Sequence, residues 1–233
     1  MSSDVEHFKR LAGEKAVERV KDGMVLGLGT GSSAKYATLK IGQLWQAGAI
    51  AGIVGIPTSS DTEALAREFD IPLSTLDEHP VVDLTIDGAD EIDPNLNLIK
   101  GLGGALVREK ITEIATKYLI IVADKSKLVD KLGTRSPLSV EVTQFAWRHH
   151  ARWLESLGCE SVLRGGEDSP YITDNHNFIL DCTFPHGIDN PAEMDTILNN
   201  QPGIIGHGLF LNMAHEVIVA GEDGIEVIRK ETR

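Results

Sequence analysis

Cysteine is nearly absent from the sequence, which has only Cys159 and Cys182 among its 233 residues. So few cysteines provide no disulfide framework of the kind that stabilises small secreted proteins. The segment 1–15 is charged, whereas a secretory signal peptide needs a long apolar run. We therefore expect a reduced protein of the cytoplasm.

Long apolar runs and an excess of positive charge are also lacking. No stretch approaches the roughly eighteen apolar residues of a membrane span, so we expect no membrane partner. The net charge is −13, and the 22 basic residues are scattered among 35 acidic ones, which argues against nucleic acid as a partner. A small anionic substrate is compatible with this charge, because local cations and helix N-termini dominate the field inside a cleft.

The spacing patterns of common metal and nucleophile sites are missing as well. The eight histidines show no HExxH or HxH spacing, the cysteines lie 23 residues apart, and no GxSxG motif occurs. We therefore expect no metal centre. His207 and His215, near the last expected strand, are interpreted as structural side chains.

The order of the apolar patterns predicts an α/β protein. A helical pattern over 4–21 comes first, and short apolar runs then alternate with further helical patterns. The expected strands are 24–29, 50–56, 81–86, 118–122 and 217–220, and the expected later helices are 36–44, 58–69 and 104–117. Alternation of this kind favours a largely parallel, Rossmann-like sheet that helices cover on both faces.

The pattern changes after residue 136 and predicts a second, smaller domain. The expected elements are a strand at 138–142, a helix at 145–157, a strand at 161–164, strands at 171–173 and 177–182 on either side of a turn, a helix at 192–199 and a strand at 204–210. Apart from the short extra strand at 171–173, this is the β-α-β-β-α-β order of a ferredoxin-like α+β domain. We therefore expect a Rossmann-like catalytic domain over 1–132 plus 206–233, and a small ferredoxin-like domain over 133–205.

The segment 27–33, with the sequence GLGTGSS, is the first candidate binding site. It follows an expected strand, where glycines permit close approach of a ligand and the next helix offers free N–H groups to an anion. Thr30, Ser32 and Ser33 add hydroxyl donors. The segment also fits the G-x-G-x-x-A dinucleotide fingerprint, although the strand at 50–56 ends without a carboxylate for a ribose. A nicotinamide-dependent oxidoreductase and a plain strand-to-helix turn are the alternatives.

The segment 87–93, with the sequence DGADEID, places acidic residues directly after another expected strand. Open α/β sheets bind their ligands at this carboxyl edge. Asp87 and Asp90 are suited to hold sugar hydroxyls or to move protons, and carboxylates so close together also suit a divalent cation. The alternative interpretation is a solvated acidic turn.

The segment 100–110, with the sequence KGLGGALVREK, combines glycines, a cation and a carboxylate. Lys100 supplies a positively charged donor, and Glu109 lies in the following helix, where it is a candidate base. The alternative is that Glu109 and its charged neighbours are ordinary exposed helix residues. Lys127 follows the strand at 118–122, so it also lies at a carboxyl edge and is a candidate contact for an anion.

Taken together, these and other segments resemble a known family. A close resemblance to ribose-5-phosphate isomerases of the A type is carried by six segments, taken in this order: GTGSSA, DGADEIDP, LIKGLGGALVREKI, VADKSKLVDKLG, PLSVEV and TDNHNFILD. The resemblance extends from Gly29 to Asp181 and implies an aldose–ketose isomerase of the non-oxidative pentose phosphate pathway. It implies interconversion of D-ribose 5-phosphate and D-ribulose 5-phosphate through an enediolate, no metal or organic cofactor, and a homodimer or homotetramer.

The resemblance also implies roles for individual residues. Glu109 is the proton acceptor. The chemistry of isomerisation, which needs a donor at the enediolate oxygen and an open sugar ring, further assigns Lys100 to that oxygen and either Asp87 or Asp90, or both, to the opening of the furanose ring. The implied substrate-binding residues are Lys9, Thr30, Gly31, Ser32, Ser33, Asp87, Gly88, Ala89, Asp90, Lys100, Gly101, Leu102, Gly103 and Lys127. Ser33 stands where threonine is commoner, and Leu102 replaces a glycine of some members.

A non-enzymatic alternative is the sugar-phosphate-sensing domain of a transcriptional regulator, which could share the sheet and the phosphate loop. Such a regulator should carry a basic DNA-binding segment, and the sequence shows none. A sensor without catalysis would also have little need for Glu109 and Lys100 together.

Overall fold

The computed structural model describes residues 2–230. The chain forms two compact units, each made of separate stretches of sequence. Unit 1 comprises Met1–Ala89, Arg108–Lys127 and Met213–Arg233, and unit 2 comprises Asp90–Val107 and Leu128–Asn212. The chain passes between the units next to several candidate site residues, at Ala89 and Asp90 and again at Val107 and Arg108.

Unit 1 is built on a six-stranded sheet with the order β13-β12-β6-β3-β1-β2. Its strands are β1 (Val25–Leu28), β2 (Val54–Pro57), β3 (Leu84–Gly88), β6 (Leu119–Asp124), β12 (Glu216–Gly221) and β13 (Gly224–Arg229). All pair in parallel except β13, which is antiparallel to β12. Every residue of β6 and β12 is buried, as expected for parallel strands covered on both faces.

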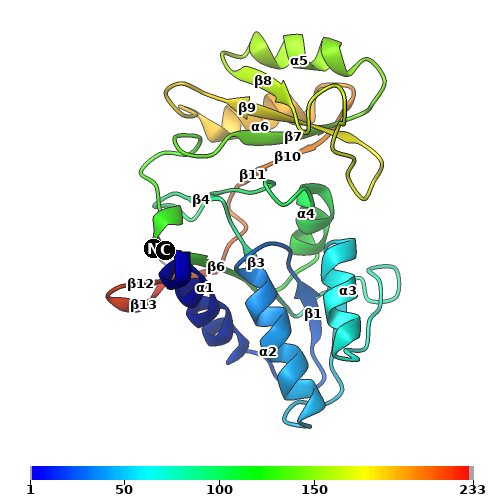
Figure 1. Ribbon diagram of the computed structural model, residues 1–233, viewed down its shortest axis with the longest axis vertical. Coiled ribbons are helices and arrows are strands. Elements are labelled where there is room, and N and C mark those ends of the chain that lie inside the picture. The colour runs from blue at the N-terminus through cyan, green and yellow to red at the C-terminus, as the bar shows by residue number, and fades with distance from the viewer. Residues whose placement is uncertain (1, 231–233) are drawn as a thin grey trace. The chain divides into compact units, whose positions relative to one another are not determined.

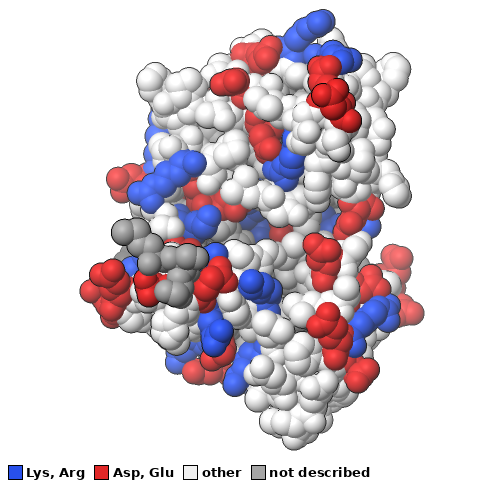
Figure 2. Space-filling view, viewed as in Figure 1, with Lys and Arg blue, Asp and Glu red and all other residues white. Residues whose placement is uncertain are grey.

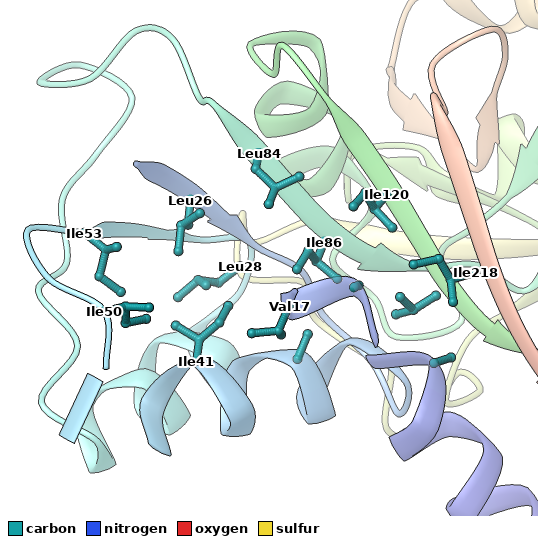
Figure 3. Close-up of a cluster of buried hydrophobic side chains, with 14 of the residues drawn as sticks. Val17, Leu26, Leu28, Ile41, Ile50, Ile53, Leu84, Ile86, Ile120 and Ile218 are labelled. Atoms are coloured by element: carbon teal, nitrogen blue, oxygen red, sulfur yellow. The ribbon is translucent and has the colours of Figure 1, made fainter. Parts of the chain in front are cut away.

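Four helices belong to unit 1 wholly or in part: α1 (Ser2–Val17), α2 (Ala34–Gln46), α3 (Ser60–Glu68) and α4 (Leu106–Ile114). Figure 1 shows α1 and α2 side by side, and the two helices are in contact. Figure 3 shows Ile41 of α2 beside Leu26 and Leu28 of β1, within the buried cluster that covers this face of the sheet. This core holds the carboxyl ends of β1 and β3 in place.

Unit 2 contains a four-stranded antiparallel sheet with the order β10-β7-β9-β8. The strands are β7 (Leu138–Val142), β8 (Glu160–Leu163), β9 (Phe178–Thr183) and β10 (Ile204–His207), and the helices are α5 (Trp147–Glu155) and α6 (Pro191–Asn199). The helix α5 packs on β8 and β9, and α6 packs on β10 (Figure 1). The order β7-α5-β8-β9-α6-β10 is the ferredoxin-like order that the sequence predicts.

Unit 2 also includes residues 90–107, which the sequence analysis assigns to the Rossmann-like domain. These residues form β4 (Glu91–Ile92) and β5 (Leu98–Ile99), which join β11 (Leu209–Phe210) in a three-stranded sheet. The buried carboxylate of Glu91 accepts hydrogen bonds from the amides of Gly133, Arg135 and Ser136 at 2.6, 2.6 and 2.5 Å. These long-range contacts place 90–107 in unit 2, and residues 128–132 and 206–212 belong to it too.

Several expected elements have different limits in the structure. The first helix ends at Val17, the strand expected from residue 50 begins at Val54, and α4 is shorter than the predicted 104–117. Residues 171–173 form no strand, and β13 is a strand that the sequence analysis did not predict. Apart from the absent strand at 171–173, these differences lie at element ends and at an edge strand, where local apolar patterns are weakest.

Two further observations concern the helices and the charged surface. Within residues 2–230, the helices are all too short or too polar to cross a membrane. On the face shown in Figure 2, Lys and Arg side chains are interspersed with Asp and Glu and form no continuous basic stripe.

Candidate active site

The first part of the candidate site lies at the carboxyl edge of the unit 1 sheet. Strand β1 lies between β2 and β3, so the strand order changes direction at β1. Open α/β sheets bind ligands in the crevice beyond such a switch point. Two predicted segments lie there, because residues 29–33 follow β1 and Asp87 lies near the end of β3.

Asp87 joins these two segments. Its Oδ1 accepts hydrogen bonds from the Thr30 amide at 3.1 Å and from the Gly88 amide at 2.7 Å, and the side chain is fully buried. A Cβ atom on Gly29 would overlap the Asp87 carboxyl group, so only glycine fits there. The structure therefore brings the glycine-rich segment and the DGAD segment together.

The loop 30–33 ends in the N-terminus of α2. Gly31 has φ +112°, which favours glycine, and Gly31 and Ser32 are exposed. Ser33 is only 8% exposed, and it precedes α2 without capping the helix through its side chain. An exposed loop that leads into a helix N-terminus is a favourable place for an anion.

The side chain of Thr30 points into a buried group of hydroxyls that the sequence analysis did not find. Its Oγ1 lies 2.7 Å from Thr58 Oγ1, 2.8 Å from Ser59 Oγ and 3.1 Å from Thr62 Oγ1. Thr62 also donates to the Gly29 carbonyl oxygen at 3.1 Å, and Thr58 donates to the carbonyl oxygen of Leu28. We call Thr58, Ser59 and Thr62 the hydroxyl cluster. Through these hydrogen bonds the cluster supports the loop 30–33.

The hydroxyl cluster also bears on the dinucleotide alternative. Thr58 and Ser59 come directly after β2, at the position where a dinucleotide-binding fold carries the carboxylate that binds a ribose. Both side chains are buried and bonded to Thr30. The end of β2 therefore supports the loop and offers no ribose ligand.

Glu109 lies in the first turn of α4 and is only 4% exposed. This burial excludes the interpretation of Glu109 as an ordinary exposed helix charge. Glu113, one turn later on the same helix, is equally buried at 4%. A buried carboxylate near a helix N-terminus is a suitable group for proton transfer.

Two lysines of unit 1 complete this part of the site. Lys127 is half-buried at the end of a short 3₁₀ helix (Lys125–Lys127) that follows β6 directly. Lys125 in the same turn pairs with Asp223 at 3.4 Å and with Glu226 at 3.6 Å. Of these two lysines, Lys127 is therefore the better candidate for an anionic ligand.

Lys9 is held on α1 by an ion pair with Glu6 at 2.9 Å. The other carboxylate oxygen of Glu6 accepts a hydrogen bond from Tyr36 of α2 at 2.6 Å. The hydrogen bonds from Tyr36 and Lys9 lower the pKa of Glu6 to about 2. Glu6 thus fixes Lys9 beside α2, the helix whose N-terminus follows the loop 30–33.

The second part of the candidate site lies in unit 2. Asp90 accepts a hydrogen bond on Oδ2 from the Leu102 amide at 3.0 Å, so the structure brings Asp90 and the loop 100–104 together. Lys100 is 2% exposed, its amide donates to the Gly208 carbonyl oxygen at 2.9 Å, and its Nζ lies 5.4 Å from the centroid of the Phe210 ring. The lysine is therefore held in a buried, ordered position.

Glycine is required at both ends of the loop 101–104. Gly101 and Gly104 have φ values of +123° and +78°. A Cβ atom on Gly101 would lie 2.8 Å from Ser139 Cβ, and one on Gly104 would overlap the Tyr171 ring. Leu102 is 46% exposed, which agrees with a position that contributes its backbone.

Arg164, just after β8, contacts this loop and was missed by the sequence analysis. Its guanidinium group donates to the carbonyl oxygens of Gly101 and Leu102 and to the side chains of Asp181 and Ser139. A lone arginine after a short strand gives no local signal of a partner more than sixty residues away. Only the pairing of the strands reveals the contact.

The two histidines near the last strands are structural, as expected. His207 is fully buried and its Nε2 lies 3.2 Å from Asn199 Oδ1. His215 accepts a hydrogen bond on Nδ1 from the Leu119 amide at 3.1 Å. Across residues 2–230 no group of three or more His, Cys, Asp or Glu side chains is arranged to hold a metal ion.

Comparison with known proteins decides the family. The sequence model of the family described as ribose 5-phosphate isomerase A (phosphoriboisomerase A) matches residues 54–224. The chain belongs to this family. A probable chloroplastic ribose-5-phosphate isomerase 3 of Arabidopsis thaliana is 50% identical over 231 residues, which cover 97% of this chain and 84% of the relative.

Solved structures of ribose-5-phosphate isomerases have the same fold. The enzyme of Plasmodium falciparum matches with a TM-score of 0.94 and 39% identity, over 97% of this chain and all of its own. A D-ribose-5-phosphate isomerase in complex with phospho-erythronic acid matches with a TM-score of 0.93 and 43% identity, over 97% of this chain and 99% of its own. The predicted family and the predicted fold class are therefore confirmed.

Proposed function

We propose that this member of the ribose 5-phosphate isomerase A family interconverts D-ribose 5-phosphate and D-ribulose 5-phosphate through an enediolate. The observation that carries the proposal is the match to isomerases of this name over nearly the whole chain. One of these relatives binds phospho-erythronic acid, a phosphorylated sugar acid. This reaction belongs to the non-oxidative pentose phosphate pathway.

The loop Thr30–Ser33 binds the substrate phosphate. Its support comes from the hydroxyl cluster and Asp87, so the exposed Gly31 and Ser32 amides are presented from a fixed backbone at the start of α2. Lys9, which Glu6 holds beside α2, adds positive charge. Binding the phosphate, far from the reacting carbons, provides binding energy for orienting the sugar.

Glu109 transfers the proton between C1 and C2. Aldose–ketose isomerisation removes a proton from one carbon and returns it to the neighbouring carbon, so one carboxylate is sufficient for both steps. The burial of Glu109 in the first turn of α4 keeps bulk water away from this exchange.

Lys100 stabilises the enediolate. Removing the proton develops negative charge on the carbonyl oxygen, and a fixed cation at that oxygen contributes roughly 10²- to 10³-fold to the rate. Lys100 meets this requirement because its backbone and its side chain are both held within unit 2. Lys127 contacts another part of the anionic substrate.

Asp87 and Asp90 open the furanose ring, which must happen before the carbonyl group is available. Gly88 and Ala89 connect the two carboxylates and, with Gly101, Leu102 and Gly103, contribute backbone groups to substrate binding. Each carboxylate is oriented by a backbone amide, Asp87 by Thr30 and Asp90 by Leu102. These fixed orientations suit carboxylates that exchange protons with a sugar.

The reaction needs no metal or organic cofactor, because Glu109 and Lys100 supply the proton transfer and the charge stabilisation. We further propose a homodimer or homotetramer in the cytoplasm, where the free thiols of Cys159 and Cys182 stay reduced. Sedimentation of the purified protein distinguishes these two assemblies from a monomer.

The test of this function mixes the purified protein with ribose 5-phosphate in the presence of EDTA and without nucleotide, and follows the products by NMR. The expected result is rapid formation of ribulose 5-phosphate. A protein that binds the sugar phosphate without converting it, or that needs an added metal, would contradict the proposal.

A further inference from the structure

Arg164 holds two successive peptide groups of the loop 100–104. Its Nη1 donates to the carbonyl oxygen of Gly101 at 2.9 Å and to that of Leu102 at 3.2 Å. The side chain of Arg164 is itself only 15% exposed.

The rest of the guanidinium group is fixed by the four-stranded sheet of unit 2. Nε and Nη2 donate to the two carboxylate oxygens of Asp181 at 2.9 and 2.6 Å, and Nη2 also donates to Ser139 Oγ at 2.8 Å. Asp181 lies on β9 and Ser139 on the neighbouring strand β7. Because the planar guanidinium group is bonded on one side to the loop 100–104 and on the other to Asp181 and Ser139, it connects the loop rigidly to the sheet. A lysine would not provide this connection.

The same peptide groups are also constrained from their other side. In a trans peptide, the N–H points away from the carbonyl oxygen. The Gly101–Leu102 peptide therefore directs its carbonyl to Arg164 and its N–H to Asp90, which accepts it at 3.0 Å. The Leu102–Gly103 peptide has its carbonyl on Arg164 too, so the Gly103 N–H points away from the guanidinium group.

This arrangement fixes the direction in which the Gly103 N–H points. Gly103 is exposed, and within residues 2–230 its N–H donates to no protein acceptor. The loop thus presents a backbone donor whose direction is fixed by Arg164. It does so one residue after Leu102, whose amide orients the carboxylate of Asp90.

We infer that Arg164 is a positioning residue of the isomerase. It directs the Gly103 N–H at a substrate oxygen and keeps the position of Asp90 fixed relative to that of Lys100. The inference rests on the proposed function, because it assigns the loop 100–104 to the substrate. Arg164 itself touches no reacting atom in this account. It acts through the loop.

The test compares Arg164→Ala and Arg164→Lys with the unchanged protein. A displaced loop is expected to lower kcat on the order of 10²-fold in Arg164→Ala. KM for ribose 5-phosphate should change less than about threefold, because the phosphate is assigned to Thr30–Ser33. Millimolar guanidinium chloride should restore part of kcat in this variant, because the ion can fill the space left by the side chain.

Arg164→Lys keeps a positive charge beside Asp181 and so protects the fold. One ammonium group cannot serve the two carbonyl oxygens and the carboxylate together, so kcat should stay low. The matched control is Arg148→Ala, which removes an exposed arginine of α5 in unit 2 that pairs with Glu167 at 2.7 Å. Its kcat should remain within about twofold of the unchanged protein and should not respond to guanidinium.

Hydrogen exchange provides a readout that needs no activity. In both Arg164 variants the amides of Leu102 and Gly104, which donate to Asp90 and to the Gly101 carbonyl oxygen, should exchange faster, whereas those of β7 and β9 should keep their protection. Arg148→Ala should leave the loop unchanged. If the unchanged protein does not isomerise ribose 5-phosphate, the proposed function fails, and the exchange data alone decide whether Arg164 holds the loop.

Two results would overturn the inference. One is a folded Arg164→Ala protein whose kcat stays within about twofold of the unchanged protein. The other is a loss of kcat without faster exchange of the Leu102 and Gly104 amides, which would show that the arginine acts elsewhere.

Discussion

Asp87 and Thr30, which are 57 residues apart in the chain, are joined by a hydrogen bond of 3.1 Å from the Thr30 amide to the Asp87 carboxylate. The bond connects the ends of β1 and β3, the two strands at the switch point of the sheet. A residue assigned to ring opening therefore also shapes the loop assigned to the phosphate.

This double role predicts different effects for two substitutions of Asp87. Asp87→Asn keeps an oxygen that can accept from the Thr30 and Gly88 amides, so kcat should fall while KM stays nearly unchanged. Asp87→Ala also removes the acceptor, so KM should rise in addition, by about tenfold for the loss of charged hydrogen bonds. Steady-state kinetics with ribose 5-phosphate measures both parameters, and equal KM values for the two variants would contradict the support of the loop.

From the hydrogen bonds of the hydroxyl cluster we predict that replacing Thr62 lowers the free energy of unfolding. Thr62→Val keeps the shape of the side chain but removes the hydrogen bond to the Gly29 carbonyl oxygen and the contact with Thr30. The free energy of unfolding should fall by about 1–3 kcal/mol, and KM should rise. Thr196→Val is the control, because the exposed Thr196 hydroxyl bonds only to its own helix. Equal urea midpoints for the two variants would show that the cluster is energetically unimportant.

The sequence patterns predict the strands that carry the candidate site, but not the side chains that support it. Each glycine-rich or acidic motif follows an apolar run, so its position at a carboxyl edge can be inferred locally. Thr58, Ser59 and Thr62 look like ordinary helix-cap residues in the sequence, and Ser59 does cap α3. Their bonds to Thr30 span 28 to 32 residues, which no local pattern encodes.

The division of the chain into two units is likewise not encoded in local sequence patterns. The two strands within residues 90–107 have only two residues each, so their apolar pattern gives no indication of the unit to which they belong. Long-range contacts assign them to unit 2: β5 pairs with β11, and the Glu91 carboxylate accepts hydrogen bonds from amides more than forty residues away. From the sequence alone, a buried carboxylate in such an acidic motif cannot be told from an exposed one.

From the contacts of Glu216 we predict that the free energy of unfolding depends on pH. Its Oε2 accepts hydrogen bonds from Arg19, Tyr118 and Arg229, each at 2.9 Å. Burial raises the pKa of Glu216, but the hydrogen bonds from Arg229 and Tyr118 and the charge of Arg19 outweigh it, so the pKa falls below 4.5. A carboxyl group with a lowered pKa stabilises the fold above its unfolded pKa, and this contribution is lost as the pH falls through the folded pKa.

Glu216→Gln should therefore lower the free energy of unfolding at neutral pH by about 1–3 kcal/mol. The difference from the unchanged protein should shrink as the pH falls below 4.5. Denaturant unfolding over a pH series measures it. A difference that stays constant through the acid range would contradict an ionised Glu216.

From the role proposed for Lys100 we predict that replacing it slows the chemical step. Lys100→Ala should lower kcat by roughly 10²- to 10³-fold and raise KM much less, because the charge is needed where the enediolate oxygen develops. Lys15→Ala is the control, since Lys15 pairs with Glu18 on the exposed side of α1. If only KM changes in Lys100→Ala, the lysine binds the ground state and does not stabilise the enediolate.

The central claim is that Glu109 carries the proton between C1 and C2. The most direct measurement compares Glu109→Gln with the unchanged protein by NMR in D₂O, following both product formation and deuterium at the exchanging carbon. Glu113→Gln, equally buried one turn later on α4, controls for the loss of a carboxylate from this helix. The account predicts that Glu109→Gln binds ribose 5-phosphate but shows neither turnover nor exchange, while Glu113→Gln shows both. Retention of more than about a tenth of kcat by Glu109→Gln would contradict its role as the base.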